Sequence, residues 1–325
     1  MKIGNITLKH GLMLAPLAGY TNAAFREICA EHGAEYTVSE MISAKAVCYG
    51  DKKTLVLARN SSSIPMGLQL FGAEPEFIAR AIGILTSDEY LEGNASILPA
   101  AFDINMGCPV HKIVSNGEGS ALMRDKVRAA EIVRAACEAS PVPVTVKIRA
   151  GYSESTKNAP EVAEALAEAG AALVCVHGRT REQMYSGKVD VDIIREVKRA
   201  VSVPVVANGD INSGEDALRT LEYTHADGLM IGRGAVGDPW IFERIAAVLE
   251  GREPREVSAC ERAEVARRHL ADMCTLMGER RAVPEARKAV CAYFADFSGA
   301  AAARAEINTA TSQADMLAII DKILK

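Results

Sequence analysis

The sequence has no Cys-x-x-Cys pair among its eight cysteines, no apolar run of 18 residues, and no hydrophobic stretch of signal-peptide type near its first residue. The first absence argues against a zinc site or a redox dithiol, so we expect no metal. The second argues against a membrane-spanning helix. The third favours a cytoplasmic protein whose thiols stay reduced.

The chain also lacks a strong excess of charge. Its formal net charge is −5 over 325 residues, which argues mildly against a polyanionic partner. Residues 255–325 carry 11 Lys and Arg against 10 Asp and Glu, so the net negative charge falls on the rest of the chain. A modest basic patch lies within 262–288, and a solvated helix face explains it more simply than a nucleic-acid contact does.

Short apolar runs, many of them β-branched, alternate with helical patterns along the first 235 residues. This alternation is typical of βαβ units and a parallel sheet, and eight such units favour an α/β fold of the (β/α)8 TIM-barrel type. The predicted strands are Leu12–Ala15, Glu35–Ser39, Pro65–Leu70, Ala101–Ile104, Val144–Ile148, Leu173–Val176, Val205–Ala207 and Gly228–Ile231. The predicted helices between them are Asn22–Glu31, Pro75–Leu85, Lys126–Ala139, Pro160–Ala169, Val191–Ala200 and Gly214–Tyr223.

Seven of the eight runs deliver a polar side chain or a glycine at or just after their ends. In chain order, the residues at these ends are Pro16, Glu40, Gln69, Asn105, Lys147, His177, Asn208 and Gly232. Barrel enzymes build their sites from the C-terminal ends of the strands, where the loops converge on one mouth. The set therefore predicts one shared site, although each residue alone could serve a structural hydrogen bond.

The barrel pattern ends near residue 250. We expect Asp238 to cap the last barrel helix, with Pro239 as its first residue. After a break at 251–255, helical patterns without strand-like runs occupy 258–277, 284–297, 300–307 and 313–324. We therefore predict two domains, a catalytic barrel at 1–250 and a small all-helical domain at 255–325.

The segment Asp103–Pro109 contains the most reactive group near the predicted strand ends, the thiol of Cys108. Its apolar run leads directly into an amide, a glycine, a thiol and a proline, as a buried strand does when it ends in a loop. A thiol at that place can act as acid, base or nucleophile. The alternative is that Cys108 is a small buried hydrophobe.

Two glycine-containing segments follow the last two predicted strands, where barrels commonly bind phosphate. Glycines let backbone N–H groups approach a phosphate, and Arg233 can add a bidentate contact. The segment 232–237 also fits G-x-G-x-x-G, but it follows the eighth strand rather than the first, which argues against a Rossmann site.

Lys147 would point its ammonium group into the barrel mouth, where a cation can stabilise electron density on a bound ring. Gln69 and Asn208 supply amides that can read a heteroaromatic edge. Phosphate and ring together favour flavin mononucleotide (FMN). Two alternatives stay open: Lys147 could form a Schiff base, or it could be a counter-ion to Asp103 or Glu40.

Several motifs, in this order, resemble those of the tRNA-dihydrouridine synthase family, with the bacterial B-type branch most similar. They are Leu14–Asn22, Gln69–Gly72, Asp103–Pro109, Lys147–Gly151, Val176–Thr180, Asn208–Ile211 and Ile231–Gly234. The resemblance runs from residue 1 to the C-terminus and includes the predicted helical domain. It differs at Asn22, where the family has aspartate, and at Tyr152, where it has tryptophan.

The resemblance implies flavin-dependent reduction of tRNA uridines to 5,6-dihydrouridine, with FMN as cofactor and NADPH or NADH as reductant. It implies Cys108 as the proton donor and Asn105 beside the flavin or the uracil. The implied flavin-binding residues are Pro16, Leu17, Ala18, Gln69, Lys147, His177, Asn208, Gly209, Asp210, Gly232 and Arg233. The helical domain could hold the tRNA backbone through Arg280, Arg281, Arg287 and Lys288.

Two other functions remain as alternatives. One is an FMN barrel that reduces or oxidises a free pyrimidine, as a dihydroorotate dehydrogenase does, and such an enzyme needs no extra binding domain. The other is a non-catalytic tRNA-binding protein, against which Cys108 and the full flavin set argue.

Overall fold

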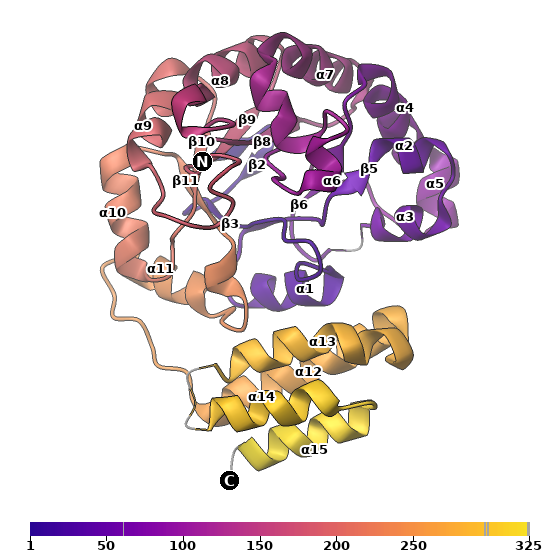
Figure 1. Ribbon diagram of the computed structural model, residues 1–325, viewed down its shortest axis with the longest axis vertical. Helices are drawn as coiled ribbons and strands as arrows, with labels where there is room; N and C mark the ends of the chain where they lie inside the picture. The colour runs from indigo at the N-terminus through magenta and orange to yellow at the C-terminus, as the bar shows by residue number, and fades with distance from the viewer. Residues whose placement is uncertain (61, 296, 298, 324–325) are drawn as a thin grey trace.

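The protein, seen here as a computed structural model, is described over residues 1–60, 62–295, 297 and 299–323. Within these residues, eight parallel strands close into a barrel surrounded by helices (Figure 1). The barrel strands are β3 (Leu12–Leu14), β4 (Tyr36–Val38), β6 (Met66–Phe71), β7 (Ala101–Met106), β8 (Val144–Arg149), β9 (Leu173–His177), β10 (Val205–Asn208) and β11 (Gly228–Ile231). Each overlaps one predicted strand, so the (β/α)8 TIM-barrel prediction is confirmed.

The barrel closes through two pairings that join the ends of the sheet. β11 pairs with β3, with Ile231 opposite Leu14, and β4 pairs with β6, with Thr37 opposite Met66. A short strand β5 (Ile42–Ser43) also lies along β6. An antiparallel hairpin of β1 (Lys2–Ile3) and β2 (Ile6–Thr7) packs Ile3 into the hydrophobic cluster inside the barrel, together with inward-facing residues such as Met13, Tyr36 and Met230.

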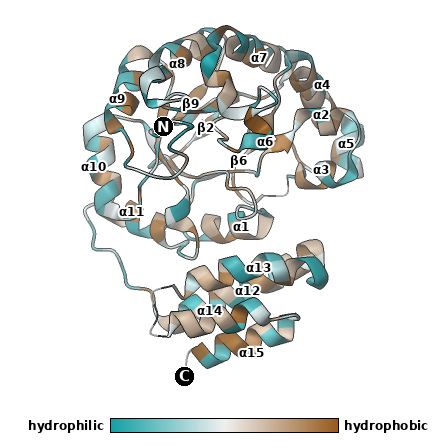
Figure 2. Ribbon diagram, viewed as in Figure 1, coloured by the Kyte–Doolittle hydropathy of each residue, from teal (hydrophilic) through white to brown (hydrophobic). Residues whose placement is uncertain are grey.

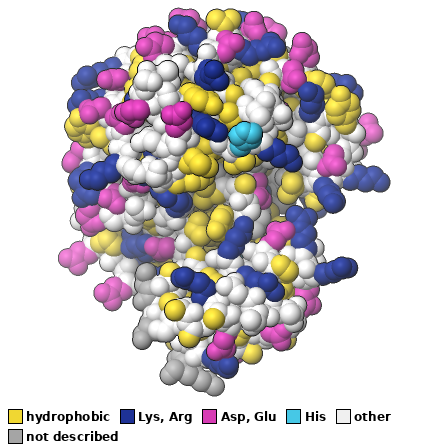
Figure 3. All heavy atoms as spheres, in the orientation of Figure 1, with side chains coloured by type: hydrophobic (Ala, Val, Ile, Leu, Met, Phe, Trp, Pro, Cys, Tyr) yellow, Lys and Arg dark blue, Asp and Glu magenta, His cyan; other side chains and the backbone are white. Residues whose placement is uncertain are grey.

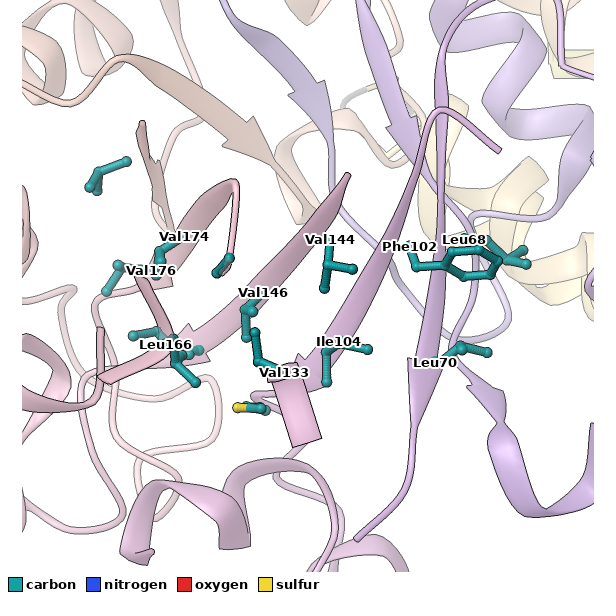
Figure 4. Packing of buried hydrophobic residues seen from close by; sticks show 14 of the residues in the cluster. Leu68, Leu70, Phe102, Ile104, Val133, Val144, Val146, Leu166, Val174 and Val176 are labelled. Carbon is teal, nitrogen blue, oxygen red and sulfur yellow. The ribbon is translucent and has the colours of Figure 1, made fainter. Parts of the chain in front are cut away.

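Side chains alternate along each strand, and this alternation separates the core from the site. Every second residue faces outward and packs against the helices, as Figure 4 shows for residues of β6–β9 with Val133 and Leu166 of the surrounding helices. The residues between them face into the barrel. On β7, Phe102 and Ile104 pack outward, whereas Asp103 and Asn105 point inward.

The surrounding helices are α1 (Ala23–Glu31), α4 (Pro75–Leu85), α7 (Lys126–Ala139), α8 (Ala159–Glu168), α9 (Val191–Ala200), α10 (Gly214–Thr224) and α11 (Ile241–Leu249). They mix polar and apolar residues, as amphipathic helices on a barrel do (Figure 2). Asn22 caps α1 by accepting from the Phe25 N–H at 3.1 Å, so the departure from aspartate keeps the cap.

The cap of the last barrel helix was predicted wrongly. Asp238 does not cap α11, whose first residue is Ile241 and whose N-cap is Trp240. Pro239 and Trp240 form a turn before the helix, and the Asp238 carboxylate instead accepts from Arg244.

Short elements that lacked a sequence pattern fill the loops. They are α2 (Ala44–Cys48), α3 (Lys52–Leu57), α5 (Asp88–Gly93), α6 (His111–Val114) and the 3-10 turns η1 (Gly119–Arg124), η2 (Glu154–Thr156) and η3 (Arg233–Ala235). None of the helices in the described part of the chain combines the length and the apolar character that a membrane crossing requires.

Four C-terminal helices pack below the barrel (Figure 1). They are α12 (Ala259–Met277), α13 (Glu279–Tyr293), α14 (Ala300–Thr309) and α15 (Gln313–Ile323). They share a hydrophobic cluster that also contains Trp240 and Ala24 from the barrel, so their core is continuous with the barrel surface. α13 begins five residues before the predicted start, because Pro284 lies inside the helix rather than at its first turn. Residues 296 and 324, which fall within predicted helices, lie outside the described residues.

Candidate active site

The inward-facing residues at the C-terminal strand ends line one cavity. It holds about 1030 Å³ of empty space, a figure that includes space open to solvent. The predicted flavin residues all line it, as do Cys108 and Asn105: Pro16, Leu17, Ala18, Gln69, Lys147, His177, Asn208, Gly209, Asp210, Gly232 and Arg233. The four basic residues predicted on the C-terminal helices do not.

A hydrogen-bonded chain of buried side chains forms one side of the cavity. Asp103 accepts from Gln69 Nε2 at 2.7 Å and from Thr145 Oγ1 at 2.6 Å. Asn105 Nδ2 donates to Gln69 Oε1 at 2.8 Å, so the Gln69 amide is held at both ends. Burial raises the pKa of Asp103, although its two hydrogen-bond donors oppose that shift.

Asn105 also shapes the loop that carries the thiol. Its Oδ1 accepts the backbone N–H of Cys108 at 2.9 Å and that of Gly107 at 3.2 Å. The Cys108 carbonyl in turn accepts from the N–H and the hydroxyl of Ser120, at 3.1 and 2.8 Å. The backbone N–H and the carbonyl of Cys108 are therefore both hydrogen-bonded, and this holds the thiol at the cavity wall.

The Cys108 side chain is half-buried and borders the cavity. Burial raises the pKa of its thiol, and the positive charges of Arg149 and Lys147 only partly oppose this. The group therefore stays protonated near neutral pH, which suits a proton donor rather than a thiolate nucleophile.

Lys147 lies at the base of the cavity. Its Nζ donates to Asn208 Oδ1 at 2.9 Å, and Asn208 Nδ2 donates to the Met230 carbonyl at 2.6 Å. Its hydrogen bond thus goes to an amide, and in the described residues Lys147 forms no ion pair with Asp103 or Glu40. Burial lowers the pKa of Lys147.

The far end of the cavity presents backbone N–H groups. Within the described residues, those of Gly209, Gly232, Arg233 and Gly234 have no hydrogen-bond acceptor. Gly209 has φ +119°, and a Cβ there would lie 3.0 Å from the His177 ring, so glycine allows this close approach. Backbone donors without acceptors at one end of a cavity are suited to an anion such as phosphate.

Charged side chains near these N–H groups pair with one another. The Asp210 carboxylate pairs with Arg179 at 2.7 Å and with Arg233 at 3.3 Å, so its backbone rather than its side chain is suited to contact an anion. Burial, together with the surrounding cations, lowers the pKa of His177 well below its usual value. His177 is therefore neutral at physiological pH.

Two buried arginines of the site were missed by sequence reasoning. Arg149 donates to the carbonyls of Gly107, Thr180 and Met184 at 2.7–2.8 Å and so ties the Cys108 loop to the loop after β9. Arg179 donates to the carbonyls of Ser186 and Gly187. Each stands two residues after an inward-facing residue, Lys147 or His177, and that spacing was the available signal.

The predicted basic residues of the C-terminal helices differ in their surroundings. Lys288 Nζ lies 4.3 Å from the centroid of the Tyr20 ring, in the loop that continues from Pro16–Ala18, so this lysine reaches the barrel. Arg281 pairs with Glu285 at 2.9 Å on the surface. Arg280 lies near the α12–α13 turn. Arg287 donates from Nε and Nη2 to the Ala310 carbonyl, at 3.2 and 2.6 Å.

Because Arg287 holds the carbonyl that follows α14, we expect Arg287→Ala to lower the free energy of unfolding by about 1–2 kcal/mol, the usual cost of a lost charge-assisted hydrogen bond. Arg281→Ala, which removes an exposed pair on the same helix, is the control and should change it by less than about 0.5 kcal/mol. Urea unfolding measures both. Equal stabilities for the two variants would show that the Ala310 contact is not structural.

The comparisons with known proteins all find the same kind of protein. A family model described as "Dihydrouridine synthase (Dus)" matches residues 13–325. A "Probable tRNA-dihydrouridine synthase" of Rickettsia conorii is 38% identical, covering 99% of this chain and 95% of its own. Proteins named "tRNA-dihydrouridine synthase B" from Shewanella oneidensis and Pseudomonas aeruginosa are 38% and 39% identical, covering 99% and 95% of this chain and 97% and 91% of their own.

Proposed function

The chain belongs to the dihydrouridine synthase family, and we propose that it reduces uridine in tRNA to 5,6-dihydrouridine, with FMN as bound cofactor and NADPH or NADH as reductant. The observation that carries the proposal is that one cavity combines a protonated thiol, a buried lysine and a group of open N–H donors.

The residues of the cavity fit FMN. Gly209, Gly232 and Gly234 offer N–H groups for a phosphate, with the Arg233 guanidinium beside them. At the other end, Lys147 and the amides of Gln69 and Asn208 surround the space for a polar ring. Pro16, Leu17 and Ala18 add an apolar wall.

When bound and reduced, the flavin supplies a hydride to carbon 6 of uracil. Cys108, as the half-buried acid at the cavity wall, would then donate a proton to carbon 5. Lys147, when protonated, would place a positive charge where electron density must be stabilised, and burial lowers the pKa of this group. Asn105 fixes the Cys108 loop through its Oδ1, and its amide borders the same space. The target base must leave its stack to enter the cavity.

We further propose that the two parts of the chain have different roles. Residues 1–250 would form the catalytic domain, and residues 255–325 would hold the tRNA backbone. Lys288 supports this assignment best, since it faces the barrel loop that contains Pro16–Ala18. Arg280 and Arg281 lie on the surface and can meet phosphates. Arg287 would contribute mainly by holding the Ala310 carbonyl.

The function is tested with purified protein, reconstituted with FMN where needed. With NADPH, it should form dihydrouridine in unmodified tRNA, as detected by mass spectrometry of the digested RNA. Free uridine, uracil and orotate serve as competing substrates. Reduction of a free pyrimidine but not of tRNA would favour the alternative enzyme, and tRNA binding without any turnover would favour the non-catalytic alternative.

Lys147→Met should weaken FMN binding by at least about tenfold, because it removes a buried charge-assisted donor and leaves Asn208 Oδ1 without its partner. Titration of the apoprotein with FMN, followed by flavin fluorescence, measures this without any turnover. The matched control is Lys198→Met, which removes a lysine paired with Asp227 on the outside of the barrel. If Lys147→Met binds FMN as tightly as the control does, Lys147 does not contact the flavin.

A further inference from the structure

Three side chains from neighbouring loops stack at the rim of the barrel mouth. The Tyr152 ring centroid lies 4.9 Å from the Arg124 guanidinium carbon and 5.4 Å from that of Arg181. Arg124 ends η1, in the connection after β7, whereas Tyr152 and Arg181 follow β8 and β9. All three therefore belong to loops at the C-terminal ends of the strands, which is the end that carries the site. We call this group the arginine–tyrosine rim.

The positive charge of the rim is unbalanced. Arg128, one turn beyond Arg124, pairs with Glu131, but in the described residues neither Arg124 nor Arg181 has a carboxylate oxygen within 4 Å. Arg124 is exposed, and Arg181 is half-buried with a buried Nε that has no acceptor among the residues that the structure describes. Holding two guanidinium groups against one ring without a counter-ion costs electrostatic energy, which a bound anion would relieve.

The backbone holds the rim in place. The Arg181 N–H donates to the Gly151 carbonyl at 3.0 Å, and the Glu182 N–H donates to the Tyr152 carbonyl at 3.1 Å. A Cβ on Gly151 would lie 2.5 Å from the Thr156 carbonyl oxygen, so the tight approach of this loop requires glycine. The backbones of Tyr152 and Arg181 are thus held together before any ligand arrives, which lowers the entropic cost of binding.

The rim lies across the mouth from the C-terminal helices. Its loops adjoin α7, α8 and α9, which lie on the side of the barrel opposite α12–α15 (Figure 1). Lys and Arg side chains gather around the mouth and again on the C-terminal helices (Figure 3). Tyr185, 48% exposed, continues the rim into the cavity, with the Arg233 guanidinium carbon 5.3 Å from its ring centroid.

We propose that Arg124, Tyr152 and Arg181 bind the phosphate backbone of the RNA strand beside the uridine that enters the cavity. This inference rests on the proposed function. It gives the tRNA a second contact, opposite the C-terminal helices. RNA fits the rim better than an acidic protein does, because phosphates accept from arginine and unstacked bases pack on aromatic rings. A strand held at both places crosses the mouth, which fixes the flipped nucleotide over Cys108.

The double variant Arg124→Ala/Arg181→Ala tests the rim in the FMN-loaded enzyme. Binding of unmodified tRNA is measured by filter retention across a series of KCl concentrations. We expect the Kd to rise about tenfold near 0.1 M KCl and the slope of log affinity against log salt to fall by about 1.4, the value for two lost phosphate contacts. Reduction of the flavin by NADPH without tRNA should be unchanged.

Arg195→Ala is the matched control, since it breaks an arginine–tyrosine stack with Tyr223 on α9 and α10 and should leave tRNA affinity unchanged. If the double variant loses flavin or folds poorly, Arg124→Glu replaces it, because Arg124 is exposed and its reversal should still raise the Kd. Arg124→Lys/Arg181→Lys keeps both charges and should recover most of the affinity.

Affinity and salt slope equal to those of the parent protein would overturn the assignment of the rim. That result would leave the proposed function intact as long as the parent protein binds and modifies tRNA. A parent protein that neither binds nor modifies tRNA would instead contradict the proposed function itself.

Discussion

Cys108→Ala is expected to keep its FMN and to lose turnover on tRNA by a factor of about 10²–10⁴, the usual contribution of a positioned general acid. The loop around Cys108 is held by Asn105 Oδ1 and by Ser120, and neither contact uses the thiol. Removing the sulfur should therefore leave the backbone and the flavin cavity in place. The change is measured as the rate at which tRNA reoxidises the reduced enzyme in a single turnover.

The pH dependence gives a second readout of the same residue. Burial raises the pKa of the Cys108 thiol, so the proton-donating form is present through neutral pH and is lost only as the pH rises through that raised pKa. The parent enzyme should therefore show a flat rate near neutrality and an alkaline decline. Cys108→Ala should lack the part of this decline that reports the thiol.

Cys137→Ala is a suitable control for both measurements. Cys137 is also half-buried, but it lies on α7 at the outside of the barrel and contacts the Gly170 carbonyl at 3.4 Å. Its replacement should change neither turnover nor the pH profile. If Cys108→Ala were as active as Cys137→Ala, the proton would have to come from another group, and the assignment of Cys108 would be wrong.

The barrel could be predicted from the sequence because parallel strands are buried on both faces and read as short, continuous apolar runs. Leu173–Val176 and Gly228–Ile231 are such runs, and the predicted α4, α7 and α9 have the observed bounds. The short helices α2, α3 and α5 could not be predicted, since each spans less than two turns and shows no helical period. Tyr90 of α5 is held by the Leu55 carbonyl at 3.0 Å, a contact that only the folded chain brings together.

Part of the site could also be predicted from the sequence, because the geometry of the strands decides which side chains face the cavity. The alternation of side chains on β7–β9 placed Asn105, Lys147 and His177 in the cavity, and the structure brings them together as the strand ends predicted. Arg149 and Arg179 were not predicted, because arginine is usually exposed and the sequence gives no sign of what would balance its burial. In the structure, carbonyl groups of distant loops accept hydrogen bonds from these buried arginines, as those of Gly107 and Met184 do from Arg149.

The second large effect concerns stability. Trp240→Ala is expected to lower the free energy of unfolding by about 3–5 kcal/mol, the range for a fully buried large aromatic residue. Trp240 lies in the turn before α11, yet it belongs to the hydrophobic cluster of the C-terminal helices. Its ring lies 5.0 Å from His32 of the barrel and 6.4 Å from Tyr293 of α13, and its indole N–H donates to Glu261 of α12 at 2.9 Å.

Because these contacts join the barrel to the C-terminal helices, the substitution should loosen that junction more than it disturbs the cavity. We therefore expect the tRNA Kd to rise while FMN binding stays close to that of the parent. Urea unfolding gives the stability, and Leu276→Ala, at a 50% exposed position on α12, is the control with a loss below about 1 kcal/mol. A Trp240→Ala protein as stable as this control would show that the C-terminal helices are held to the barrel by other contacts.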